Sequence, residues 1–115
     1  MKTVWTSPIA SQEIVTGPEV TIQPGATVIR YCDTNEDWHE LTFSGILFFS
    51  FTEFGACREE HVDAYDKLLE LGTDTPLAKE ILSGARSDIK GMRHYRIFFD
   101  EVGAYDIIAR NAKCP

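Results

Sequence analysis

The C-terminal segment His94–Ala109 constrains the fold of this chain more than any other segment. Apolar side chains occupy every second position of Tyr95–Phe99, and again of Tyr105–Ala109. Such a period of two is typical of strands with one buried face. Between the two runs, Asp100 can hydrogen-bond its own turn backbone, and Gly103 can adopt the positive φ that closes a short loop. The segment therefore predicts an antiparallel β-hairpin.

The first half of the chain predicts a meander of strands. The turn-forming dipeptides Gly17-Pro18 and Pro24-Gly25 lie between short β-like runs. These runs are Thr3–Thr6, Glu13–Thr16, Val20–Gln23 and Thr27–Cys32. A longer β-like run, Glu40–Phe54, follows and predicts a central strand. Because Gly45 lacks a side chain, we expect this strand to bend or bulge there.

Helical spacing replaces the strand pattern in the third quarter of the chain. Apolar residues recur every three or four positions over Arg58–Leu71, and Gly72 follows, which predicts an amphipathic helix. A second, shorter helix is predicted to begin after Thr75, with Pro76 at its first position, and to end at Gly84. Together the segments predict one α+β domain over residues 1–115. Its mostly antiparallel sheet has six or seven strands, with the helical hairpin packed on one face.

The charge of the chain is strongly acidic and unevenly distributed. The net charge is −7, and residues 1–70 hold twelve acidic and four basic side chains. This balance opposes binding to nucleic acid or to an anionic membrane, since both require an excess of Lys and Arg. The chain contains three cysteines and no apolar run of signal-peptide or membrane-spanning length. We therefore expect a cytoplasmic protein with reduced thiols.

The acidic turn Asp33–Asp37 resembles the first half of a calcium-binding EF-hand loop. The second half of the loop does not fit. Trp38 stands where the EF-hand turn needs glycine, and Ser44 stands where a bidentate glutamate belongs. The pattern favours a polar turn over a metal site.

The same turn is our leading candidate for a binding surface. Glu36, Asp37 and Glu40 surround Trp38, and an aromatic side chain among carboxylates is a common interface anchor. The residues predict an acidic docking face for a basic protein, because complementary charge speeds encounter and selects partners. The alternative is that Trp38 belongs to the buried core.

Cys57 and His61 are four residues apart, as in half of a zinc site or in a nucleophile–base pair. No other cysteines or histidines lie at ligand spacing, so no metal site is predicted. No glycine loop typical of an oxyanion hole precedes Cys57. Phosphate-binding, serine-hydrolase and zincin motifs do not occur either, so we predict no cofactor and no catalytic residue.

Two histidines provide an alternative site. His39 and His94 each stand beside an aromatic residue at the start of a predicted strand. If the two strand ends are adjacent, these imidazoles, with Glu40 and Tyr31, form an acid–base cluster in a small-ligand-binding protein or small enzyme. The basic stretch Arg86–Arg96 either holds an anion in this site or is a solvated loop.

The H-Y-R-I-F-F-D-x-x-G-x-Y pattern that begins at His94 resembles a set of small uncharacterised bacterial cytosolic proteins. Leu41–Phe51 and Tyr65–Glu70 contribute to the likeness. The resemblance implies a fold and a bacterial setting, and it transfers no catalytic residue. In size and charge the chain also resembles the immunity proteins that neutralise bacterial toxins. The leading hypothesis is therefore a non-catalytic protein-binding domain, similar to an immunity protein, with the histidine site as the alternative.

Overall fold

The computed structural model describes all 115 residues and contains one seven-stranded sheet. The strands are β1 (Lys2–Thr6), β2 (Ile14–Gln23), β3 (Ala26–Asp33), β4 (Trp38–Glu53), β5 (Lys67–Leu71), β6 (Arg93–Phe99) and β7 (Gly103–Lys113). The helices are α1 (Glu59–Val62) and α2 (Pro76–Ser83), with short 3₁₀ turns η1 (Ser11–Glu13) and η2 (Phe54–Ala56). The strand order is β1-β5-β6-β7-β4-β3-β2, and every neighbouring pair is antiparallel. The predicted antiparallel sheet of six or seven strands is confirmed.

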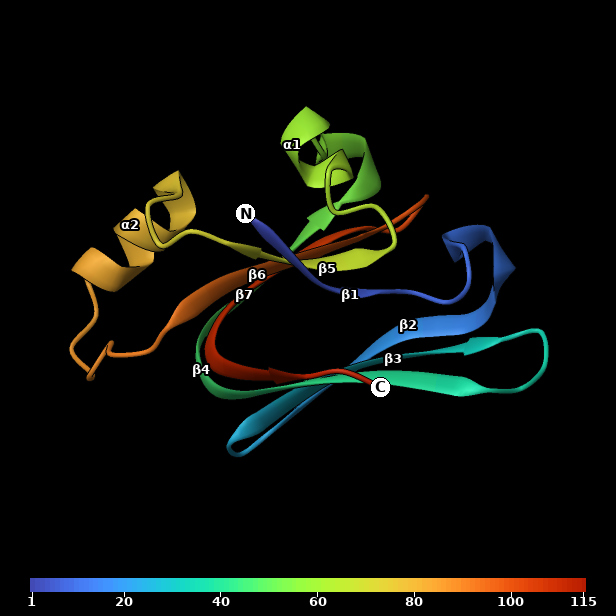
Figure 1. Cartoon of the computed structure of the whole chain (residues 1–115), viewed down its shortest axis with the longest axis horizontal. Coiled ribbons are helices and arrows are strands. Elements are labelled where there is room, and N and C mark those ends of the chain that lie inside the picture. The colour runs from blue at the N-terminus through green and yellow to red at the C-terminus, as the bar shows by residue number, and fades with distance from the viewer.

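The sheet folds over on itself because its two long central strands bend (Figure 1). The bend of β4 coincides with Gly45, which has φ +63°, and with a register shift between Ile46 and Phe48. This confirms the predicted irregularity at Gly45. A side chain there would crowd Arg110, whose Cβ would lie 3.0 Å from the added Cβ. The shift turns Leu47 and Phe48 outward against α2.

The fold produces two layers that enclose the main core. One layer contains β1, β5, β6 and the adjoining parts of β4 and β7, and both helices lie on its outer side (Figure 1); we call it the helix-covered layer. The bare layer contains β2, β3, residues 38–44 of β4 and the last residues of β7. Eleven buried side chains fill the space between the layers: Ile29, Tyr31, Leu41, Phe43, Leu68, Tyr95, Ile97, Phe99, Tyr105, Ile107 and Ala109.

The terminal hairpin forms as predicted, with Phe99 paired to Gly103. Gly103 has φ +141°, and a Cβ on it would overlap the carbonyl oxygen of Thr52 on β4. The predicted hydrogen bond between the Asp100 side chain and its own turn does not form. Its carboxylate accepts hydrogen bonds from the Gln12 amide (2.6 Å) and the Tyr65 hydroxyl (3.3 Å), and none from its own turn.

The predicted helix over Arg58–Leu71 is wrong, because Lys67–Leu71 is strand β5. The adjacent residues Leu68 and Leu69 are both buried, and they pack into different clusters on opposite faces of the sheet. Two neighbouring apolar residues buried on opposite faces are typical of a strand. The positive φ of Asp66 (+53°) interrupts helical geometry just before β5. The helical hairpin therefore does not form, and α1 and α2 are separated by a strand.

The second helix agrees with its prediction. The Thr75 side chain accepts a hydrogen bond from the Ala78 N–H (3.2 Å), and Pro76 is the first helical residue. Ala78 packs with Met92 and Ile108 on the outer side of the sheet. Neither helix of the chain combines the length and the apolar character needed to cross a lipid bilayer.

The N-terminal meander differs from the prediction in two places. Gly17-Pro18 does not form a turn between strands, because β2 continues past it with a shifted register. The run Thr3–Thr6 belongs to β1, which pairs with β5 at the opposite edge of the sheet from β2. Only β2, β3 and β4 form a meander.

Candidate functional site

The acidic turn between β3 and β4 is built around one buried carboxylate. Asp33 Oδ1 accepts hydrogen bonds from the backbone N–H groups of Asn35 (2.8 Å) and Asp37 (3.1 Å). Asp33 Oδ2 lies 3.1 Å from His39 Nε2. The hydrogen bond from His39, with those from the turn amides, outweighs the effect of burial and lowers the pKa of Asp33. The turn is thus held in one conformation, with Glu36 and Asp37 exposed.

Trp38 is not a core residue: 42% of its surface is exposed. The Arg30 guanidinium lies over the indole, 3.8 Å from the ring centroid, within the range of a cation–π contact. Arg30 also forms ion pairs with Glu19 (Nε–Oε2, 3.4 Å) and Glu40 (Nη1–Oε1, 3.6 Å). These contacts position the tryptophan on the outer face of the bare layer.

A surface hollow of about 460 Å³ lies beside this tryptophan. Trp38, Glu40, Thr42 and Lys113 line it. No helix lies over this face of the bare layer (Figure 1). All four predicted docking residues, Glu36, Asp37, Trp38 and Glu40, are exposed, and two of them, Trp38 and Glu40, line the hollow.

The two histidines of the alternative site do not come together. His39 stacks on Tyr31, with ring centroids 5.2 Å apart, and so faces the main core. His94 contacts Thr75 and Asp106 on the outer side of the helix-covered layer. The proposed cluster of His39, Glu40, His94 and Tyr31 is not assembled, because alternation along the strands places His39 and His94 on opposite faces of the sheet.

His94 instead belongs to a buried network of charged groups under the helices. It is fully buried, and its Nε2 lies 2.6 Å from Asp106 Oδ1. Arg96 donates through Nε to the same oxygen (2.8 Å), and Thr75 Oγ1 lies 2.8 Å from His94 Nδ1. Burial alone would raise the pKa of Asp106, but the His94 hydrogen bond and the Arg96 charge hold it below its ordinary value. Since an ionised carboxylate only accepts hydrogen bonds, the imidazole donates through Nε2.

Sequence reasoning missed Asp106 and Thr75 as members of this network. The register of the hairpin nevertheless predicts one contact of the network, the one between Arg96 and Asp106. Phe99 pairs with Gly103, so three residues further along each strand Arg96 must pair with Asp106, as it does. Opposite charges at paired positions of neighbouring strands attract each other.

The basic stretch Arg86–Arg96 is not one site. Arg93 pairs with Glu70 (3.2 Å) at the surface, and Arg96 points to Asp106. Arg86 is exposed in the loop before β6. Among these basic residues only Arg96 lines hollows, which have volumes of about 290 Å³ and 260 Å³.

Cys57 and His61 serve local structural roles. His61 Nδ1 accepts the N–H of Arg58 (2.8 Å) at the start of α1, and the Cys57 thiol contacts the Thr52 carbonyl oxygen (3.5 Å). Burial raises the pKa of the Cys57 thiol, which disfavours the nucleophilic thiolate. No group of three or more His, Cys, Asp or Glu side chains is arranged to hold a metal ion.

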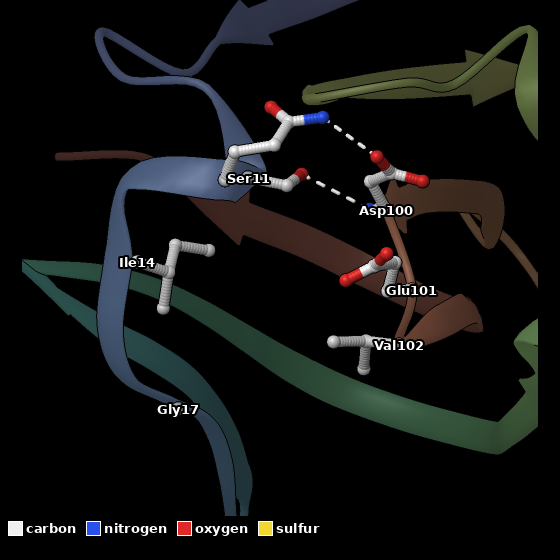
Figure 2. A pocket seen from close by; sticks show the side chains of 7 residues that line it. Ser11, Ile14, Gly17, Asp100, Glu101 and Val102 are labelled. Atoms are coloured by element: carbon white, nitrogen blue, oxygen red, sulfur yellow. Dashed lines mark hydrogen bonds between the residues drawn. The ribbon is translucent and has the colours of Figure 1, made fainter.

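A further hollow, of about 330 Å³, lies between the N-terminal segment and the β6–β7 turn (Figure 2). Hydrogen bonds link three of its polar residues, Ser11, Gln12 and Asp100. Gln12 donates to the Asp100 carboxylate, and the Asp100 N–H donates to the Ser11 hydroxyl (3.1 Å). Ser11 also contacts Asp66 through its hydroxyl and its N–H. These contacts fix η1 to the terminal hairpin.

No family model, curated protein or solved structure matches this chain. Two features of the chain's own geometry bear on function: the bare sheet face around Trp38 and the buried network of His94, Arg96 and Asp106 beneath the helices.

Proposed function

We propose that this chain is a non-catalytic protein-binding domain that docks a basic partner through Glu36, Asp37, Trp38 and Glu40. One observation carries the proposal: a half-exposed tryptophan stands among carboxylates on a sheet face that no helix covers. Tryptophan is enriched among the residues that dominate binding energy at protein interfaces. An aromatic ring held on an open strand face is available to a partner without any rearrangement of the fold.

The charges around Trp38 favour a basic partner. Four exposed carboxylates lie on this face and in its turn, against two cations: Glu19, Glu36, Asp37 and Glu40, with Arg30 and Lys113. Arg30 is already engaged by two of the carboxylates and by the indole. Glu36 and Asp37 form no ion pair within the chain, so their charges are free to attract cations of a partner.

Rigidity of the surface supports the same function. The Asp33 carboxylate fixes the turn, and Arg30 fixes the indole. Side chains that are ordered before binding lose less conformational entropy when a complex forms. A basic toxin domain is one partner that would fit this face. Toxins are the class of partner that the resemblance to immunity proteins implies.

The docking face can be tested with an NMR titration, using a synthetic peptide of alternating arginine and glycine as the basic probe. The indole N–H of Trp38 should shift, whereas that of Trp5, on β1, serves as the internal reference. The triple variant Glu36→Gln, Asp37→Asn, Glu40→Gln should bind more weakly by about tenfold, since exposed charge contacts contribute roughly 0.5 kcal/mol each.

A matched control removes three charges elsewhere. Glu59, Asp63 and Glu80 are exposed and form no ion pair, so Glu59→Gln, Asp63→Asn and Glu80→Gln together give the net charge of the test variant. The control should retain the affinity of the unaltered chain, and both variants should keep its melting temperature. Equal weakening in the two variants would mean that the affinity for the peptide depends on net charge alone, and the docking face would be refuted.

A further inference from the structure

The hollow of about 290 Å³ between α1 and α2 is lined by polar side chains from five elements. Its floor is formed by the network of Arg96 and Asp106, and its walls by Ser50 and Thr52 of β4, Glu60 of α1 and Thr75. A second hollow, of about 260 Å³, shares Glu60, Thr75 and Arg96 with it. The volume lies near the lower end of the roughly 300–1,000 Å³ of small-molecule sites, so it suits a small ligand.

Arg96 presents free hydrogen-bond donors to this hollow. Its Nε is fixed on Asp106, whereas Nη1 and Nη2 form no hydrogen bond or ion pair within the chain. Neither atom is fully buried, although only 13% of the side chain is exposed. A guanidinium held by one edge offers its other N–H groups in a fixed fork, which matches the two oxygens of a carboxylate.

Asp106 offers the complementary acceptor. His94 and Arg96 both bond to its Oδ1, and Oδ2 has no partner within the chain. Oδ2 is also not fully buried, and Asp106 lines the hollow. The hollow thus contains a free acceptor and free donors on two side chains that contact each other. Glu60, which forms no ion pair, adds a second carboxylate.

We propose that this hollow binds the α-carboxylate and α-ammonium groups of a free amino acid, with Arg96 holding the carboxylate, and Asp106 and Glu60 holding the ammonium. In an α-amino acid the ammonium and carboxylate groups are both attached to the α-carbon. The two charges of the ligand therefore lie side by side, as Arg96 and Asp106 do. A simple anion fits less well, because two carboxylates line the same hollow. This site is separate from the docking face, which lies on the bare layer.

The test is a thermal-shift screen of the full chain with the free L-amino acids at about 10 mM, since a ligand that binds only the folded state raises the melting temperature by mass action. At least one amino acid should raise it, and titration calorimetry then gives its Kd. The decarboxylated amine and the N-acetylated form of that amino acid should bind at least about tenfold more weakly, because each lacks one of the two charges.

Variants separate binding from folding. Glu60→Gln should raise the Kd several-fold, whereas Glu59→Gln, next to it on α1 and outside the hollow, should leave it unchanged. Arg96→Lys keeps a cation beside Asp106 but loses the fork, and should abolish the shift. If Arg96→Lys does not fold, the pair Glu60→Gln and Glu59→Gln decides. The proposal is overturned if no amino acid shifts the melting temperature, if the analogues bind equally well, or if the two glutamate variants behave alike.

Discussion

The two layers of the sheet each carry an arginine beside an acidic side chain on their outer face, and the two pairs differ in burial. In the helix-covered layer, Arg96 and Asp106 are 13% and 4% exposed, with Nε and Oδ1 2.8 Å apart. In the bare layer, Arg30 and Glu40 are 37% and 53% exposed, with 3.6 Å between Nη1 and Oε1. Burial strengthens both the attraction between charges and the cost of leaving one unpaired. The first pair is therefore part of the fold, whereas the second stays in contact with solvent and contributes little to stability.

Removing the acid from each pair should give the largest difference between the layers. Asp106→Ala leaves Arg96 and His94 without their shared acceptor and should reduce the free energy of unfolding by about 3–5 kcal/mol. Glu40→Ala removes an exposed ion pair and should cost about 0–1 kcal/mol. Urea unfolding followed by circular dichroism measures both values. Similar losses for the two variants would show that the helices do not shield Asp106 from solvent.

The hairpin glycines give a second comparison of the layers. Gly103 and Gly25 both have positive φ, so valine at either position should cost about 1–3 kcal/mol in backbone strain. Only Gly103 is also packed against Thr52, whereas nothing lies within 4 Å of a Cβ added to Gly25. Gly103→Val should therefore be more destabilising than Gly25→Val by about 1–3 kcal/mol, the usual cost of overpacking. Equal melting temperatures for the two variants would show that a side chain at position 103 does not clash with Thr52, and would contradict this close contact of the terminal hairpin.

Local pattern was sufficient to predict the elements of the fold that depend on neighbouring residues. The terminal hairpin follows from alternation and from Gly103, and α2 follows from Thr75 and Pro76. The bend at Gly45 follows from one missing side chain. Each of these signals acts within a few residues, so the chain segment alone determines the outcome.

Elements that depend on tertiary contacts were predicted less well. Lys67–Leu71 has helical spacing, but the sheet offers burial on both faces, and Leu68 and Leu69 use both. Tertiary burial thus overrides local preference. The residues of the proposed docking face could be named from the sequence because they lie within one short turn and the start of the strand that follows it. The network of His94, Asp106 and Thr75 was missed because α2 brings Thr75 over the sheet, and no local pattern predicts that approach.

The smallest effect we expect concerns the Asp33 carboxylate that organises the acidic turn. Its hydrogen bonds to His39 and to the turn amides lower its pKa in the folded chain, whereas an aspartate in the unfolded chain has a pKa of about 3.9. The unfolded chain then binds more protons between the two pKa values, so the contribution of Asp33 to stability is complete above about pH 4 and is lost as the pH falls through the folded pKa.

Asp33→Asn keeps an acceptor for the turn amides but removes the charge. The stability difference between the unaltered chain and Asp33→Asn, measured by urea unfolding at a series of pH values, should therefore shrink as the pH falls below about pH 4. A difference that stays constant down to pH 2 would show that the carboxylate is not held as an anion. The bare layer would then lack the fixed turn on which its docking face depends.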